Sequence, residues 1–143
     1  MKTKNIIILV VIVLIFLGGL FALSGEKKNN STIQPKSSLS FQNITSSELI
    51  KMLKNKDFFF VNVHIPYEGE IAKTDAFIPY NEIERNLGQL PEDKNAKIVL
   101  YCRSGRMSEE AAKALINLGF TNVYNHTGGM ISWEAKGYTV LRK

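Results

Sequence analysis

The strongest fold signal in this chain lies in residues 100–110, with the sequence LYCRSGRMSEE. They begin within an apolar run, 98–101, that is typical of a buried strand. They end where a helix over 109–118 is expected to begin, with Ser108 as its N-cap. The short connection between the two holds the single cysteine of the chain, Cys102. A strand-loop-helix connection points backbone N–H groups and the positive end of the helix dipole at whatever lies in the loop.

The residues that follow Cys102 favour a chemical role for its thiol. Arg103 and Arg106 place two positive charges in the loop, and Ser104 and Gly105 lie between them. Backbone amides and cations around a cysteine favour the nucleophilic thiolate and cradle a sulfur anion attached to it. A buried cysteine that acts only as a small apolar side chain is the alternative. The flanking polar residues favour a nucleophile with an anion site.

Composition limits the remaining possibilities. With 143 residues and 45% hydrophobic residues, the chain has room for one packed domain and a tail. The formal net charge is +5, but from residue 40 onward 13 Lys and Arg face 12 Asp and Glu. No stripe of basic and aromatic residues is visible, so nucleic acid is not an expected partner. A single cysteine excludes a disulfide within the chain and a multi-cysteine metal site, and we expect no metal and no cofactor.

The first 24 residues have the pattern of a targeting segment. Lys2 and Lys4 precede an apolar run over 6–23, which is 18 residues long. This length is near the lower limit for a helix that crosses a bilayer. Small residues at Ala22 and Ser24 also fit the cleavage site of a signal peptide. The sequence therefore predicts an N-terminal hydrophobic helix over 1–24, as a signal peptide or a membrane anchor.

The rest of the chain divides into a linker and a domain. Residues 25–40 are rich in Ser, Lys and Asn, and we expect them to form a flexible linker. The domain is expected over 41–143. A charged start followed by an apolar run usually exports what comes after it. We therefore expect the domain outside the cytoplasm, in the cell envelope, either anchored to the membrane or released as a secreted or periplasmic protein.

Strands alternate with helices along the domain. Thr45 and Glu48 have the spacing of a capping box and predict a helix after them. The other expected elements are strands over 58–63 and 122–124, a weak helical signal over 82–87 and a helix over 130–136. This order predicts an α/β fold with a parallel sheet covered on both sides.

Three candidate residues follow strands of that sheet: His64, Cys102 and His126. Ligands bind beyond the carboxyl ends of parallel strands, so a Cys-His couple of the kind used by cysteine hydrolases is conceivable. Neither histidine lies in a hydrolase signature, and histidines at strand ends are more often structural. A hydrolase is therefore not the favoured interpretation.

Two motifs and one weaker segment carry a resemblance to a known family. Residues 102–108, CRSGRMS, precede 128–138, GGMISWEAKGY, and the weaker segment is 61–66, VNVHIP. These segments resemble parts of the rhodanese-like domain, a family of single-domain sulfurtransferases. Residues 102–108 resemble its active loop, 128–138 its closing glycine-tryptophan motif, and 61–66 an earlier strand end. The resemblance covers about 41–140 and implies a three-layer α/β/α domain with a central, mainly parallel sheet.

The resemblance also implies a reaction. Cys102 takes a sulfane sulfur from a small anionic donor such as thiosulfate, holds it as a persulfide and passes it to a thiol or to cyanide. The protein is expected to act as a monomer. Substrate binding is expected from the loop, with two histidines as a possible pocket edge. These residues are Arg103, Ser104, Gly105, Arg106, Met107 and Ser108 in the loop, and His64 and His126 at the edge.

Departures from the family pattern leave an alternative open. Asn62, His64 and Met107 stand where relatives usually carry Asp, Arg and Arg, which predicts a less positive pocket. These substitutions mildly favour a non-catalytic binding module at the cell envelope, whereas the intact cysteine loop favours an enzyme. Phosphatases of similar fold need an arginine six positions after the nucleophile, and Ser108 occupies that position here.

Overall fold

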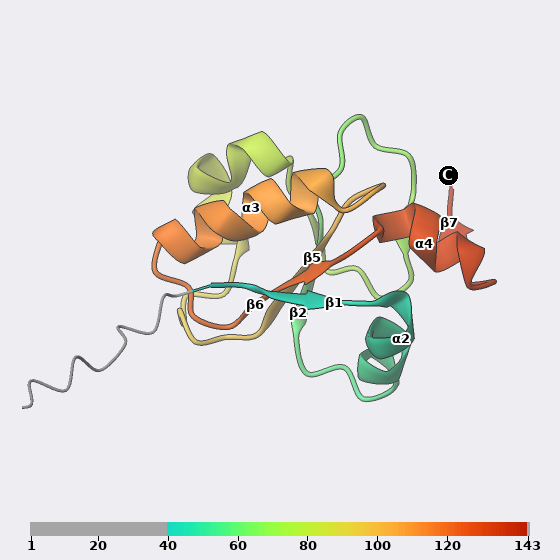
Figure 1. Cartoon of the computed structure of the whole chain (residues 1–143). Helices are drawn as coiled ribbons and strands as arrows, with labels where there is room; N and C mark the ends of the chain where they lie inside the picture. Colours follow the sequence, from blue (N-terminus) through green and yellow to red (C-terminus); the bar gives the residue numbers. More distant parts are fainter. Residues whose placement is uncertain (1–39, 143) are drawn as a thin grey trace, which may run out of the picture. The chain divides into compact units, whose positions relative to one another are not determined.

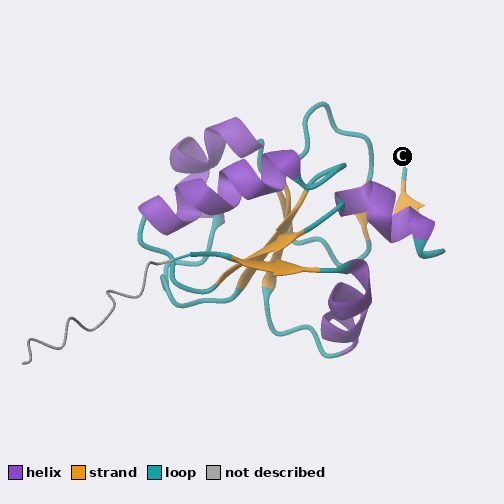
Figure 2. Ribbon diagram, in the orientation of Figure 1, coloured by secondary structure: helices purple, strands orange, loops and turns teal. Residues whose placement is uncertain are grey.

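The computed structural model describes residues 40–142, in which strands and helices alternate as expected (Figures 1 and 2). In chain order the elements are β1 (Gln42–Ile44), α2 (Ser46–Lys54), β2 (Phe59–Asn62), β3 (Glu70–Ile71), β4 (Ala76–Phe77), the 3-10 helix η1 (Tyr80–Gln89), β5 (Ile98–Tyr101), α3 (Arg106–Asn117), β6 (Val123–His126), α4 (Gly129–Ala135) and β7 (Val140–Leu141). The expected targeting segment, 1–24, lies outside these residues, as does the linker up to residue 39. Within 40–142, no helix is both long and apolar enough to cross a membrane.

The central sheet is parallel throughout. Its five strands lie in the order β1-β6-β5-β2-β4, so that β5 is in the middle. β5 pairs in register with β2 and β6, with Leu100 opposite Val61 and Asn125. A separate antiparallel pair joins β3 to β7. The predicted parallel sheet is confirmed, and Cys102 follows its central strand.

Helices cover both faces of the sheet, and together they make the predicted three-layer α/β/α domain (Figure 1). Alternate residues of β5 pack into two different cores, as the period of a strand requires. Ile98 and Leu100 pack with buried residues of α3 and η1, whereas Val99 and Tyr101 pack with those of α2 and α4. Because both faces are covered, the central strand is apolar along its whole length.

The start of α2 confirms the predicted capping box. The Thr45 hydroxyl accepts a hydrogen bond from the Glu48 backbone N–H at 3.3 Å, and a Glu48 carboxylate oxygen accepts one from the Thr45 N–H at 2.7 Å. Leu49 and Leu53 are buried beneath the helix. Both backbone groups at this end of α2 are therefore satisfied within the protein.

The start of α3 differs from the prediction. The helix begins at Arg106, and its N-cap is Gly105 rather than Ser108. Gly105 has a left-handed φ of +96°, a conformation that glycine adopts without steric cost. This turn lets the helix begin directly after the loop, three residues before the expected start. Ser108 then lies buried in the first helical turn, where its hydroxyl donates to the Gly105 carbonyl at 3.1 Å.

Other differences from the sequence prediction concern short or polar elements. β1, β3, β4 and β7 have two or three residues each, too few for a recognisable alternation. The weak helical signal at 82–87 corresponds to η1, which is longer. The strand expected over 122–124 extends to His126, because β6 pairs with both β1 and β5 and thereby buries Asn125 and His126.

Candidate active site

Cys102 lies at the carboxyl edge of the sheet, directly after β5, and only 1% of its surface is exposed. Residues 103–105 carry the chain around it and into α3. No side chain caps the first turn of this helix. The first amides of a helix lack partners within the helix itself, so the loop presents backbone donors beside the thiol.

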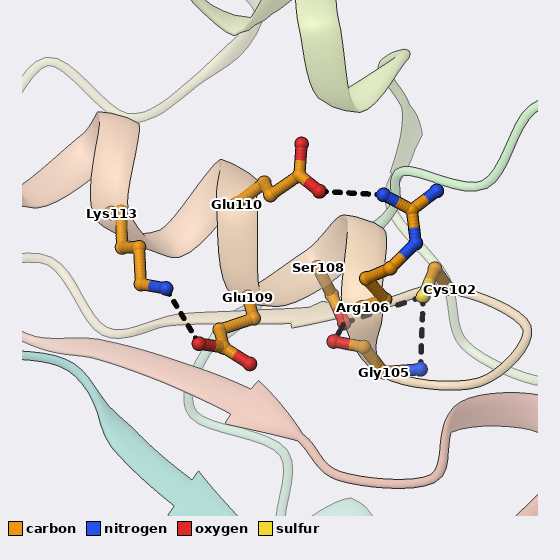
Figure 3. A network of polar contacts seen from close by, with 7 residues as sticks. All are labelled: Cys102, Gly105, Arg106, Ser108, Glu109, Glu110 and Lys113. Atoms are coloured by element: carbon orange, nitrogen blue, oxygen red, sulfur yellow. Dashed lines mark hydrogen bonds and ion pairs between the residues drawn. The ribbon is translucent and has the colours of Figure 1, made fainter.

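Two donors contact the sulfur directly (Figure 3). The Gly105 N–H donates to the Cys102 Sγ at 3.0 Å, and the Ser108 hydroxyl lies 3.5 Å from the same atom. The hydroxyl also donates to the Gly105 carbonyl, so it is shared between the loop and the sulfur. Donors aimed at a sulfur atom before any reaction stabilise negative charge there without further rearrangement.

The loop is held from behind by the start of α4. The Met130 N–H donates to the Cys102 carbonyl at 2.9 Å, and the Ile131 N–H donates to the Arg103 carbonyl at 3.0 Å. Gly129 lies so close to this loop that a Cβ there would overlap the Cys102 carbonyl oxygen. A Cβ at Gly105 would in turn come within 2.9 Å of the Gly128 nitrogen. The glycine motif at 128–129 therefore sets the shape of the cysteine loop.

Both arginines of the loop form ion pairs at the surface. Arg103 Nε lies 3.3 Å from a carboxylate oxygen of Glu68. Figure 3 shows the second pair, in which Arg106 lies 2.7 Å from Glu110. The side chains of Arg103 and Arg106 are 58% and 66% exposed, whereas the sulfur is buried. The donors that reach the sulfur are thus a backbone amide and a hydroxyl.

The other loop residues line the surroundings of the site. Ser104 and Gly105 lie at a polar depression of about 320 Å³, beside Asn125 and Thr127. Met107 is half-buried and packs against the core beneath α3. Trp133, in the closing motif, is buried in the other core.

The two histidines have other contacts. His126 Nε2 lies 2.9 Å from the Ser46 hydroxyl, and burial lowers the pKa of His126 to about 4. His64 is buried with its Nε2 3.5 Å from a Glu68 carboxylate oxygen. Within the described residues neither ring is hydrogen-bonded to the sulfur, whose partners are Gly105 and Ser108. The structure thus shows no Cys-His hydrogen bond in residues 40–142.

Sequence reasoning missed two contributors to the site. Glu68 faces Arg103 from a loop 35 residues earlier in the chain, and only the tertiary fold brings them together. The backbone amides of α4 bind the cysteine loop over a similar distance along the chain. The glycine motif at 128–129 was visible in the sequence, but these hydrogen bonds were not. In residues 40–142, no group of three or more His, Cys, Asp and Glu could hold a metal ion.

Comparisons with known proteins agree with the fold. A model of the rhodanese-like domain matches residues 45–136. A sulfurtransferase from Allochromatium vinosum is 30% identical over 95 residues, which are 64% of this chain and 85% of that protein. The structure of a rhodanese-related protein from Thermoplasma volcanium, 27% identical, aligns with a TM-score of 0.60 over 72% of this chain and 100% of that one.

Other relatives are longer proteins. A tRNA uridine(34) hydroxylase from Hamiltonella defensa is 35% identical over 98 residues, which are 64% of this chain. The chain matches only 28% of that protein's length.

Proposed function

Since the chain belongs to the family of rhodanese-like domains, we propose that it is a sulfurtransferase that carries sulfane sulfur as a persulfide on Cys102. Sulfurtransferase domains of this family take sulfur from a donor and pass it to a thiol acceptor. One observation carries the proposal: the Cys102 sulfur accepts a hydrogen bond from the Gly105 N–H at 3.0 Å, in a loop that α4 holds in place. A purely structural cysteine does not require such a donor.

In the first step, the Cys102 thiolate attacks the outer sulfur of a donor such as thiosulfate. A bond forms between Sγ and that sulfur, the sulfur–sulfur bond of thiosulfate breaks, and sulfite leaves with the electron pair. The new terminal sulfur carries negative charge. The uncapped first turn of α3 and the Gly105 N–H supply donors for that charge.

In the second step, a nucleophile removes the terminal sulfur. Cyanide in an assay, or a thiolate in the cell, attacks it, and the persulfide bond breaks. The Cys102 thiolate leaves with the electron pair, which restores the starting state. The loop need not change shape between the two steps, because its carbonyls stay bound to the amides of Met130 and Ile131.

A non-catalytic binding module is the second candidate, and the burial of the thiol favours it. With 1% of Cys102 exposed, a donor reaches the sulfur only if the surrounding side chains give way. The two candidates differ in one chemical property, because only an enzyme gains and loses sulfur at Cys102.

The mass of the purified full-length chain separates them. The protein is incubated with thiosulfate, and its mass is measured by mass spectrometry before and after cyanide is added. A sulfurtransferase gains one sulfur atom, loses it to cyanide and forms thiocyanate, whereas Cys102→Ser folds normally and gains nothing. A chain that gains no sulfur from thiosulfate or from an organic sulfane donor would be a binding module.

We also propose that the domain is monomeric and lies outside the cytoplasm, anchored or released by residues 1–24. Lys2 and Lys4 before the apolar run over 6–23 support this placement. Fractionation of cells that express the full chain tests it. Recovery of the protein in the cytoplasmic fraction, with its first residues intact, would contradict export.

A further inference from the structure

One carboxylate oxygen of Glu68 lies next to two basic side chains at the edge of the site. It is 3.3 Å from Arg103 Nε and 3.5 Å from His64 Nε2. The Glu68 side chain is 40% exposed, whereas His64 is buried. Glu68 thus sets a negative charge beside the first arginine of the cysteine loop.

The segment that carries Glu68 is fixed at its base. The Asn62 side-chain amide donates to the Gly69 carbonyl at 2.9 Å, and its oxygen accepts from the His64 N–H at 3.0 Å. A Cβ at Gly69 would come within 2.7 Å of the Leu141 carbonyl oxygen, so this end of the segment packs tightly against β7. The backbone on both sides of Glu68 is therefore anchored, while the Glu68 carboxylate reaches Arg103.

Both arginines that follow Cys102 are paired with carboxylates. Arg103 faces Glu68 at 3.3 Å and Arg106 faces Glu110 at 2.7 Å, and ion pairs also join Lys113 to Glu109 and Arg142 to Glu134, each at 2.6 Å. Figure 3 shows two of these pairs along α3. This pairing weakens the attraction that the two arginines can exert on a dianion such as thiosulfate.

Two exposed aromatic rings lie near the segment that carries Glu68. Tyr67, next to Glu68 in the chain, packs edge-to-face on Phe77 with ring centroids 5.4 Å apart. The two residues are 40% and 38% exposed. Exposed rings at the carboxyl edge of the sheet suit the carbon group of a substrate.

We propose that Glu68 is a specificity-determining residue that disfavours dianionic donors, and that the preferred donor carries its sulfane sulfur on an apolar organic group with at most one negative charge. This inference rests on the proposed function. With an organic thiosulfonate as donor, Cys102 attacks the outer sulfur, the sulfur–sulfur bond breaks, and the sulfinate leaves with the electron pair. The persulfide formed is the same as with thiosulfate.

The test compares two donors in the full-length chain and in Glu68→Gln. Thiosulfate carries two charges, and benzenethiosulfonate carries one charge and an aromatic ring. The wild type is expected to have the higher kcat/KM with benzenethiosulfonate. Glu68→Gln is expected to raise kcat/KM for thiosulfate by about three- to fivefold at low ionic strength, and less for the monoanion. Salt at about 0.5 M should abolish most of this gain, because the groups are exposed.

Two variants control the experiment. Asp57→Asn removes a carboxylate that pairs with Lys97 at 3.1 Å, at the amino ends of β2 and β5 and thus opposite the site, and should leave both donors unchanged. In Glu68→Gln combined with Arg103→Gln, the gain with thiosulfate should disappear, because the freed cation is gone.

The outcomes distinguish this inference from the proposed function. If Glu68→Gln loads sulfur but keeps the wild-type ratio of the two donors, the role of Glu68 is overturned and the sulfurtransferase stands. If the wild type itself prefers thiosulfate, the donor class is overturned. If neither donor loads Cys102 in any variant, both proposals fail together.

Discussion

Helices α2 and α3 begin in opposite ways. At α2, Thr45 and Glu48 satisfy the exposed backbone groups through a capping box. At α3, Gly105 offers no side chain, and its own N–H donates to the sulfur of Cys102. A side-chain cap stabilises a helix, whereas an uncapped turn leaves its donors for a ligand or for a reacting group. One helix start thus serves stability, and the proposed function assigns the other to chemistry.

The largest effect is expected where the α3 loop is held from behind. In Gly129→Ala, the new methyl group meets the Cys102 carbonyl oxygen and forces a non-glycine residue to adopt a φ of +53°. Unfolding by urea should show a loss of about 2–5 kcal/mol, and sulfur loading of the folded fraction should fall at least tenfold. Gly137→Ala is the matched control, because its φ is +81° but no atom lies within 4 Å of a new Cβ. It should cost only about 1 kcal/mol and leave loading intact. Equal effects of the two changes would contradict the role of Gly129.

A second effect concerns the α2 side, where His126 meets Ser46 at the first residue of that helix. Burial lowers the pKa of His126 from 6.5 to about 4, so the folded protein favours the neutral ring. This stabilisation is complete above pH 6.5 and is lost as the pH falls toward 4, because the unfolded chain then binds the proton. The free energy of unfolding should drop by about 3 kcal/mol over that interval.

The matched variant for this pH effect is His126→Gln, which lacks the titrating ring. The measurement is the difference between its free energy of unfolding and that of the wild type from pH 7 to pH 4, since carboxylates shared by both proteins cancel. A difference that does not change with pH would contradict a buried neutral His126.

Ser108→Ala tests the side-chain donor at the start of α3. The change removes the hydroxyl that lies 3.5 Å from the Cys102 sulfur and donates to the Gly105 carbonyl. The rate of persulfide formation, measured by mass spectrometry of quenched samples, should fall about tenfold. This corresponds to an increase of about 1.4 kcal/mol in the activation free energy. Unchanged kinetics would mean that backbone donors alone stabilise the sulfur.

Thr45→Ala tests the side-chain cap at the start of α2 and should have the smallest effect. Loss of the cap should cost about 1 kcal/mol and lower Tm by about 4–8 °C. Sulfur loading should stay at the wild-type rate, because Thr45 lies outside the cysteine loop. A variant that loses activity without losing stability would reverse the contrast between the two helix starts.

Local patterns in the sequence correctly predicted the elements whose structure depends on residues close together in the chain. The apolar run at 98–101 and the capping box at Thr45 both appear in the structure where they were expected. Ser108 was wrongly predicted as an N-cap, because serine favours that position in general, whereas here the left-handed turn at Gly105 starts the helix earlier. The polar residues Asn125 and His126 hid the end of β6, which long-range pairing buries.

The candidate site likewise has parts that the sequence predicts and parts that depend on contacts between distant segments. The cysteine, its loop and the glycine motif were visible in the sequence, since each is a contiguous pattern. The Glu68–Arg103 ion pair and the hydrogen bonds from α4 to the loop join segments about 30 residues apart, and no local rule predicts such contacts.

The hydrogen bonds from Met130 and Ile131 to the cysteine loop have a consequence for biosynthesis. A ribosome makes the loop before it makes α4, so a nascent chain carries Cys102 for some time without the helix that shapes its surroundings. The thiol becomes part of a defined site only when residues 129–135 have emerged and folded back onto it. A chain truncated before Gly128 would keep Cys102 and lose the helix that holds its loop in place.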